Sequence, residues 1–91
     1  EAEKPVLIDI RTADEYAAGH LADSAQMDYY APDFKDKLSK LDKNAKYLIY
    51  CRSGKRSTAT LKMMQDMGFS DNHDIAGGIN AWIAAGLPVV K

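Results

Sequence analysis

The chain has a single cysteine among its 91 residues, which excludes an internal disulfide. Its two histidines, His20 and His73, lie far apart in the sequence, and with one cysteine they form no zinc-binding pattern. Long apolar runs are also missing: no stretch approaches the ~20 residues that a membrane-spanning helix needs, and no signal-like segment is present. We therefore expect no disulfide, metal or cofactor to organise the fold, and no membrane insertion.

An excess of charge of either sign is absent as well. The 12 basic and 13 acidic residues leave a formal net charge of −1. Without an overall basic field the protein has no general attraction for nucleic acid or for an anionic membrane. The length suits one small domain, so we expect a single domain over residues 1–91, acting as a monomer, with any positive potential confined to a local site.

The cysteine lies between a short apolar run and a basic loop. Residues 46–50 are mainly apolar and aromatic and follow a turn-like segment, which predicts a buried strand with Cys51 at its carboxyl end. Residues 57–67 contain no glycine or proline and stop at Gly68, which predicts an amphipathic helix with a glycine C-cap. The apolar face of this helix is expected to carry Ala59, Met63 and Met67, with Thr60 and Met64 beside them.

This arrangement favours a reactive cysteine. Only the thiolate form is a strong nucleophile, and Arg52, Lys55 and Arg56 follow Cys51 within five residues. A strand, loop and helix in this order also direct backbone N–H groups and the positive end of the helix dipole into the loop. We therefore expect a lowered pKa for the Cys51 thiol and a loop that binds an oxyanion. The alternative is a small, buried and inert side chain, which is what most lone cysteines are.

Residues 51–57, Cys-Arg-Ser-Gly-Lys-Arg-Ser, resemble the Cys-x-x-Gly-x-Arg-Ser active loop of single-domain rhodaneses. Rhodaneses are sulfurtransferases that carry a sulfane sulfur as a cysteine persulfide. Other pieces resemble the family in the same order along nearly the whole chain: Asp9-Ile10-Arg11, Glu15-Tyr16, Gly19-His20-Leu21, Ala76-Gly77-Gly78, Trp82 and Gly86-Leu87-Pro88-Val89. No single motif is decisive, but the ordered set is highly specific.

The resemblance implies an α/β fold of the rhodanese type, a three-layer sandwich with a central, mainly parallel sheet flanked by helices. The alternation of predicted strands and helices indicates the same class. Rhodanese domains usually carry an extra segment before their first central strand, whereas residues 5–10 of this chain reach that strand at once. We therefore expect a flanking N-terminal strand or helix to be missing.

The resemblance also assigns roles at the loop. It implies that Cys51 is the catalytic nucleophile. The substrate-binding active loop would consist of Arg52, Ser53, Gly54, Lys55, Arg56 and Ser57. Of these, Arg52 and Lys55 are expected to bind a small anionic sulfur donor such as thiosulfate or a persulfide, and Arg56 to brace the loop. The acceptor would be cyanide, a thiol or a protein.

Two charged residues are expected to support this loop from the first strand. Residues 6–10 form an apolar run that barely alternates, which predicts a parallel strand covered on both faces. Asp9 would end that strand at the same sheet edge as Cys51 and hydrogen-bond the loop amides. Arg11 is expected to brace Glu15. We expect no direct catalytic role for Asp9.

The remaining elements are ordinary. Thr12 and Glu15 form a capping box that begins a short helix ending at Gly19. His20 then lies in a loop, where we expect a structural role, and Trp82 is expected in the core. Further strands are predicted within residues 24–28 and 69–75, and further helices at 33–41 and 79–85. The connection at Tyr29 and Tyr30 is expected to pack against the domain or to rim the substrate pocket.

Two other functions remain open. Cysteine-based phosphatases, one type of which shares the rhodanese fold, also place a thiolate and an arginine in a loop of amides. They put five residues between the two and a histidine before the cysteine, whereas here four residues separate Cys51 from Arg56, and Tyr50 precedes the cysteine. The other alternative is a sulfur-carrier or redox-sensing module in which Cys51 is modified but turns over slowly.

Overall fold

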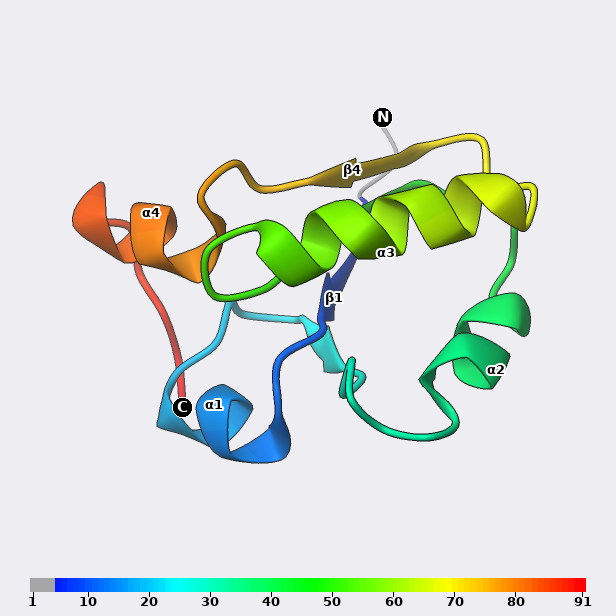
Figure 1. The fold of residues 1–91 in the computed structure, drawn as a ribbon. Helices are drawn as coiled ribbons and strands as arrows, with labels where there is room; N and C mark the ends of the chain where they lie inside the picture. The colour runs from blue at the N-terminus through cyan, green and yellow to red at the C-terminus, as the bar shows by residue number, and fades with distance from the viewer. Residues whose placement is uncertain (1–4) are drawn as a thin grey trace.

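A four-stranded parallel sheet forms the centre of the computed structural model, which describes residues 5–91. The strands are β1 (Val6–Asp9), β2 (Ala25–Gln26), β3 (Tyr47–Tyr50) and β4 (Asn72–Asp74), in the order β2-β1-β3-β4 (Figure 1). Each neighbouring pair is parallel, as the alternating strands and helices predict. The expectation of a missing segment before the first strand lies outside the described residues.

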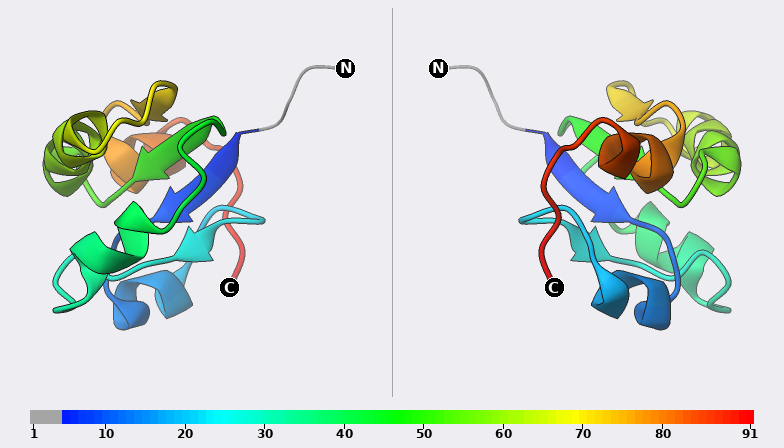
Figure 2. Two further views of the ribbon diagram at one scale, coloured as in Figure 1. Left: turned by 90° about the vertical axis from the view of Figure 1, so that its right-hand side faces the viewer. Right: turned by 90° about the vertical axis from the view of Figure 1, so that its left-hand side faces the viewer.

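Helices connect and cover the strands. They are α1 (Ala13–Ala18), α2 (Phe34–Ser39), α3 (Lys55–Asp66) and α4 (Gly78–Ala84). Figure 2 shows α2 and α3 on one side of the sheet and the C-terminal segment on the other. The predicted α/β class is confirmed, and so is the capping box, in which Thr12 and Glu15 bond to each other's backbone N–H groups.

The sheet has a separate apolar cluster on each face. On one face Ile8, Ile49 and Met64 belong to a cluster that includes residues of α2 and α3. On the other, Tyr50 packs with Ile79 and Leu21 in a smaller cluster. Successive residues of a strand point to opposite faces, so the neighbours Ile49 and Tyr50 serve the two clusters. The domain is therefore a three-layer sandwich.

The prediction about the burial of the first strand is wrong. The first strand is not covered on both faces along its length, because Val6 is 43% exposed while Ile8 is 1% exposed. The second face of the sheet is closed only at its carboxyl end, where Tyr50 and Ile79 pack. Nearer the start of β1, Leu7 instead lines an apolar groove of about 380 Å³.

The face of α3 that meets the sheet also differs from the prediction. This helix begins at Lys55, and its buried residues are Ser57, Thr60 and Met64. Their spacing is helical, but two of them are polar, so hydropathy pointed to a neighbouring stripe instead. The hydroxyl of Thr60 donates to the Arg56 carbonyl at 2.9 Å, which satisfies it inside the fold.

Trp82 and His20 have mainly structural contacts. Trp82 is half-buried rather than in the core, and its indole N–H donates to the Pro88 carbonyl at 2.7 Å. His20 stacks on the Tyr16 ring, with 3.7 Å between ring centroids, and its Nδ1 lies 2.9 Å from the Tyr16 carbonyl. Within residues 5–91, no helix combines the length and apolar character needed to cross a bilayer.

Candidate active site

The carboxyl ends of three strands meet at one edge of the sheet. Register places Asp9 of β1 beside Tyr50 of β3, and Asp74 of β4 beside Ile49. Cys51 is the residue directly after β3, so it leaves the sheet between the ends of β1 and β4. Ligands of open parallel sheets bind at this edge, which is where the sequence places the reactive loop.

Backbone N–H groups surround the sulfur of Cys51. The Gly54 N–H donates to Sγ at 3.1 Å and the Ser57 N–H at 3.4 Å. The Ser57 hydroxyl oxygen lies 3.7 Å from Sγ. Gly54 precedes α3 with φ of +105°, a conformation that favours glycine and that turns its N–H inward. The loop therefore presents fixed dipoles to a negative charge on sulfur.

Burial and hydrogen bonding act on this thiol in opposite directions. Cys51 is 0% exposed, and burial raises the pKa of a thiol because it disfavours the charged form. The N–H and hydroxyl of Ser57, with the N–H groups of Gly54 and Arg56, outweigh burial and hold the pKa below its ordinary value. Cys51 is as buried as an inert cysteine, but the surrounding amides point at its sulfur.

The other side of the loop is held by α4. The N–H groups of Ile79 and Asn80 donate to the carbonyls of Cys51 and Arg52 at 2.9 and 3.1 Å. Gly78 allows this close approach, since a Cβ there would overlap the Cys51 carbonyl and lie 2.6 Å from the Arg52 carbonyl oxygen. The loop is thus fixed by backbone contacts on both sides.

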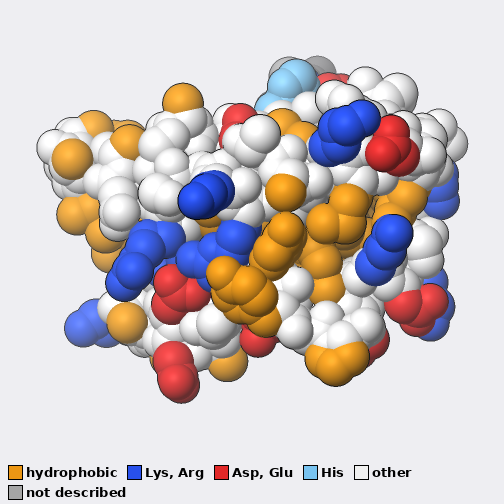
Figure 3. All heavy atoms as spheres, viewed as in Figure 1, with side chains coloured by type: hydrophobic (Ala, Val, Ile, Leu, Met, Phe, Trp, Pro, Cys, Tyr) orange, Lys and Arg blue, Asp and Glu red, His pale blue; other side chains and the backbone are white. Residues whose placement is uncertain are grey.

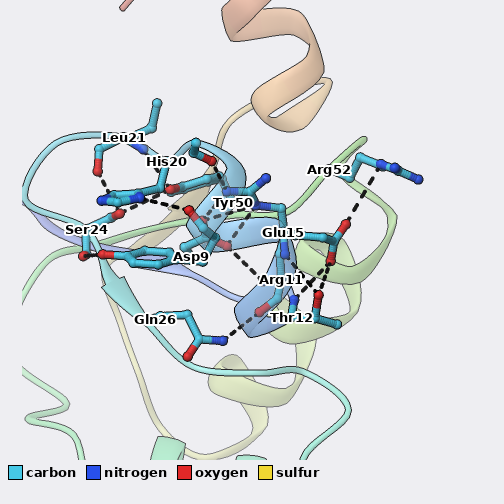
Figure 4. Close-up of polar contacts among 12 residues, drawn as sticks. Asp9, Arg11, Thr12, Glu15, His20, Leu21, Ser24, Gln26, Tyr50 and Arg52 are labelled. Carbon is cyan, nitrogen blue, oxygen red and sulfur yellow. Dashed lines mark hydrogen bonds and ion pairs between the residues drawn. The ribbon is translucent and has the colours of Figure 1, made fainter. Parts of the chain in front are cut away.

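Glu15 of α1 neutralises part of the positive charge of the loop. Its carboxylate accepts from Arg56 at 3.1 and 3.2 Å. The same carboxylate lies 3.8 Å from Arg52 Nε (Figure 4). The Arg56 bond, more than any other contact, lowers the pKa of Glu15 to about 2. Figure 3 shows basic side chains gathered around an acidic one between α1 and the start of α3. Arg56 also lies over the exposed Tyr30 ring, 5.4 Å from its centroid.

The structure corrects the expected contacts of Asp9 and Arg11. Arg11 pairs with Asp9 instead of Glu15, with 2.6 Å between Nη2 and Oδ2, and also donates to the Gly19 carbonyl (Figure 4). Asp9 accepts from the side chain and the backbone N–H of Arg11 rather than from the loop amides. Both residues are buried, so each is the nearest compensation for the other's charge.

Beside this pair, burial raises the pKa of Tyr50 to about 12. Its hydroxyl accepts the Leu21 N–H at 3.0 Å. Tyr50 therefore stays protonated at neutral pH and is no proton acceptor for Cys51.

A shallow hollow of about 230 Å³ adjoins the loop between α1 and α4. Arg52 and Glu15 line one side of it, and Asn80, Ile83 and Val89 line another. Arg52, Ser53 and Lys55 are exposed, so the polar rim of the loop is open to solvent while the sulfur is not. Within residues 5–91, no cluster of three or more potential metal ligands is present.

Two contacts at the loop were missed by reasoning from the sequence. Asp74 accepts from the Ser57 hydroxyl at 3.2 Å, and Glu15 reaches Arg56 across 41 residues of sequence. Asp74 lies within residues 69–75, where a strand was predicted, but its place next to the cysteine's strand comes from the structure. A carboxylate at the carboxyl end of a neighbouring parallel strand lies near the same edge.

Comparison with known proteins agrees with this geometry. The family model for the rhodanese-like domain matches residues 1–85. A protein named sulfurtransferase from Allochromatium vinosum is 34% identical over 99% of this chain and 82% of its own length. The thiosulfate sulfurtransferase GlpE of Pseudomonas entomophila is 32% identical over 89% of this chain and 72% of its own.

Solved structures show the same fold. The crystal structure of a rhodanese-related protein from Thermoplasma volcanium has a TM-score of 0.84 and 30% identity, covering 93% of this chain and 82% of that one. With the sequence relatives and the loop geometry, this establishes the family: the chain belongs to the rhodanese-like domain family of sulfurtransferases.

Proposed function

We propose that the domain transfers a sulfane sulfur by double displacement through a persulfide on Cys51. The observation that carries the proposal is the inward turn of the Gly54 and Ser57 N–H groups toward Sγ. Such donors stabilise a thiolate and, after sulfur has been added, the persulfide anion. Inert buried cysteines have no need of amide donors, so this contact favours the reactive interpretation.

The two half-reactions balance in atoms and charge. The Cys51 thiolate attacks the outer sulfur of thiosulfate, the S–S bond of the donor breaks with its electron pair on sulfite, and Cys51 becomes a persulfide anion. Cyanide or a thiolate then attacks the terminal sulfur and leaves as thiocyanate or a persulfide, which returns the Cys51 thiolate. No proton transfer is required when the thiol is already ionised.

The donor is proposed to be a small anion such as thiosulfate or a low-molecular-weight persulfide. Arg52 and Lys55 are exposed beside the loop and supply the positive charge that would attract it. Arg56 is engaged with Glu15 at 3.1 Å and is proposed to brace the loop more than to bind substrate. The name of the GlpE relative supports thiosulfate as the donor to test first.

Burial of the sulfur constrains how the reaction proceeds. Cys51 has no exposed surface, so a donor reaches Sγ only when side chains over the loop move aside. Gly54 and Ser57 supply the contacts to Sγ that the proposed reaction uses, so one copy of the chain is enough for it, and the monomer stays a prediction. The terminal sulfur of the persulfide, one bond further out, is the atom offered to an acceptor.

The phosphatase is less well supported. A phosphatase presents its loop arginine to the phosphate, whereas Arg56 is held by Glu15 through two hydrogen bonds. The loop between Cys51 and Arg56 also contains four residues rather than five. A slow sulfur carrier uses the same persulfide, and turnover distinguishes it from the enzyme.

The proposal is tested by an assay of sulfur transfer and by the intact mass of the protein. We expect cysteine-dependent thiocyanate release from thiosulfate and cyanide, and a gain of one sulfur atom in the intact mass after thiosulfate treatment alone. Cys51→Ser should abolish both. A stable persulfide without turnover would identify the carrier, and hydrolysis of an aryl phosphate without sulfur uptake would identify the phosphatase.

A further inference from the structure

The Ser57 hydroxyl has more acceptors around it than it has protons. Its oxygen lies 3.1 Å from the Gly54 carbonyl, 3.2 Å from Asp74 Oδ2 and 3.7 Å from Cys51 Sγ. Ser57 and Cys51 are both 0% exposed, so water does not reach either side chain. As a thiol, Cys51 donates to the Ser57 oxygen. As a thiolate, its sulfur becomes a third acceptor, beside a carbonyl and a carboxylate, for the one Ser57 hydroxyl proton.

The present distances direct that proton away from the sulfur. Both oxygen acceptors are closer to the Ser57 oxygen than Sγ is, and one of them is a carboxylate, which accepts more strongly than a neutral group. Without the Asp74 carboxylate, the neutral Gly54 carbonyl is the remaining oxygen acceptor, and the hydroxyl turns more readily toward a thiolate at Cys51. The carboxylate also places a like charge near the sulfur, which disfavours ionisation of the thiol.

We propose that Asp74 is a positioning residue that, through the Ser57 hydroxyl, controls how readily Cys51 ionises. Asp74 withholds a hydrogen bond from the thiolate and so opposes the backbone N–H groups of Gly54 and Ser57. The balance has a chemical use, since a thiolate that is stabilised too strongly is a poor nucleophile. The inference concerns the Cys51 nucleophile of the proposed function but is measured without any sulfur transfer.

Other charged groups face the loop, and none of them accepts from Ser57. Arg56 of α3 interacts electrostatically with Cys51, and Glu15 of α1 holds Arg56 in place. Asp9 of β1 is paired with Arg11. Asp74 of β4 is thus the charged group whose effect reaches Sγ through a hydrogen-bonded side chain.

The test is the ultraviolet absorbance of the thiolate during a pH titration, with Cys51→Ser as the blank, because the chain has one cysteine. Asp74→Asn is nearly isosteric, removes the charge, and presents an amide that can donate to the Ser57 oxygen. We expect it to lower the titration midpoint of Cys51 by about half to one pH unit. In a Ser57→Ala background the same substitution should shift the midpoint by less than half as much.

Asp71→Asn is the matched control. Asp71 lies just before β4 and its carboxylate contacts His73 at 2.7 Å, so the substitution removes the same charge without touching Ser57. It should move the midpoint by less than about 0.2 unit, as expected for a screened surface charge. If Asp74→Asn does not fold, Asp74→Ser carries the same expectation.

Three results would overturn the proposal. They are an unchanged or raised midpoint in Asp74→Asn, an equal shift in Asp71→Asn, and an undiminished shift in the Ser57→Ala background. A thiolate midpoint that responds as expected in a protein that takes up no sulfur would leave this inference standing and refute the proposed function.

Discussion

Buried charge is stabilised by different kinds of groups at the neighbouring ends of β1 and β3. At the end of β1 the Asp9 carboxylate is met by the guanidinium of Arg11, with contacts of 2.6, 3.0 and 3.1 Å. One strand away, the Cys51 sulfur is met by N–H groups and a hydroxyl. Register places the two ends side by side, since Asp9 pairs with Tyr50.

The difference separates a structural site from a reactive one. A carboxylate and a guanidinium that satisfy each other in the interior have little left to offer a substrate. A sulfur stabilised by peptide dipoles keeps its own charge available, because those dipoles belong to the backbone and do not move when it reacts. Glu15 adds to this difference. It binds Arg56 at 3.1 Å, so the guanidinium beside the sulfur has a carboxylate as its partner.

The largest loss of stability is expected from breaking the Asp9–Arg11 ion pair at the end of β1. Asp9→Asn leaves the Arg11 guanidinium, in a residue only 6% exposed, without its carboxylate, so the free energy of unfolding should fall by about 3–5 kcal/mol. The pH midpoint of Cys51 ionisation should change little in comparison with this loss of stability. Urea denaturation followed by circular dichroism measures the first quantity, and the absorbance titration measures the second.

An exposed pair supplies the control for this substitution. Asp33 and Lys37 lie 3.6 Å apart with side chains 57% and 55% exposed, and Asp33→Asn should change stability by less than about 1 kcal/mol. Equal losses in the two variants would mean that the buried pair has no special structural weight.

A smaller loss of stability, but a direct effect on the sulfur, is expected at Gly78. Gly78→Ala adds a Cβ that overlaps the Cys51 carbonyl at a φ of +63°, which should cost about 2–3 kcal/mol and displace the loop. Displaced amides stabilise the thiolate less, so its titration midpoint should rise.

Gly86→Ala is the control that separates backbone strain at a positive φ from steric overlap of the new Cβ. Gly86 has a similar φ of +79°, but its Cβ would have no neighbour within 4 Å. It should lose about 1 kcal/mol of stability from backbone strain alone and leave the thiolate midpoint unchanged. A raised midpoint in both variants would show that contact between Gly78 and the loop does not hold the amides in place.

Of the three sites Asp9, Gly78 and Glu15, Glu15 is expected to give the smallest loss of stability, and the pH dependence of that loss identifies the contribution of its carboxylate. The Arg56 bond lowers the pKa of Glu15 to about 2, so the carboxylate stabilises the fold fully above its ordinary pKa of 4.5. This stabilisation is lost as pH falls from about 4.5 to about 2. Glu15→Gln should therefore lower the free energy of unfolding by roughly 1–2 kcal/mol at neutral pH.

The comparison of stability curves checks this assignment. Denaturation of the wild type and Glu15→Gln between pH 7 and pH 2 should give a difference that narrows across the acidic window. A difference that is constant with pH would assign the loss to packing rather than to the carboxylate.

Short-range sequence patterns predicted the helices and strands, but they did not predict contacts between residues far apart in the sequence. Thr12 and Glu15 are three residues apart, so their capping box could be predicted from the sequence. The strand directly before Cys51 could be predicted as well. The Asp74 contact with Ser57 spans 17 residues, and it depends on the strand order of the sheet. Arg11 was assigned to Glu15, whereas in the structure it pairs with Asp9, two residues back.

The polar stripe of α3 was missed for a different reason. Ser57 and Thr60 are buried because they are hydrogen-bonded, and hydropathy counts them as surface residues. Their positions become predictable only when their partners are known. Polar side chains beside a reactive centre are therefore the part of this core that sequence periodicity describes least well.

The N–H groups of Ile79 and Asn80 hold the carbonyls of Cys51 and Arg52 through backbone bonds, which do not use the side chains of Asn80 and Ile83. Asn80 and Ile83 border the hollow next to the loop, and both are exposed. Substitutions at these two positions should therefore change the lining of the hollow while the sulfur keeps its amide contacts. The surface beside the loop can thus vary in sequence independently of the contacts that hold the sulfur.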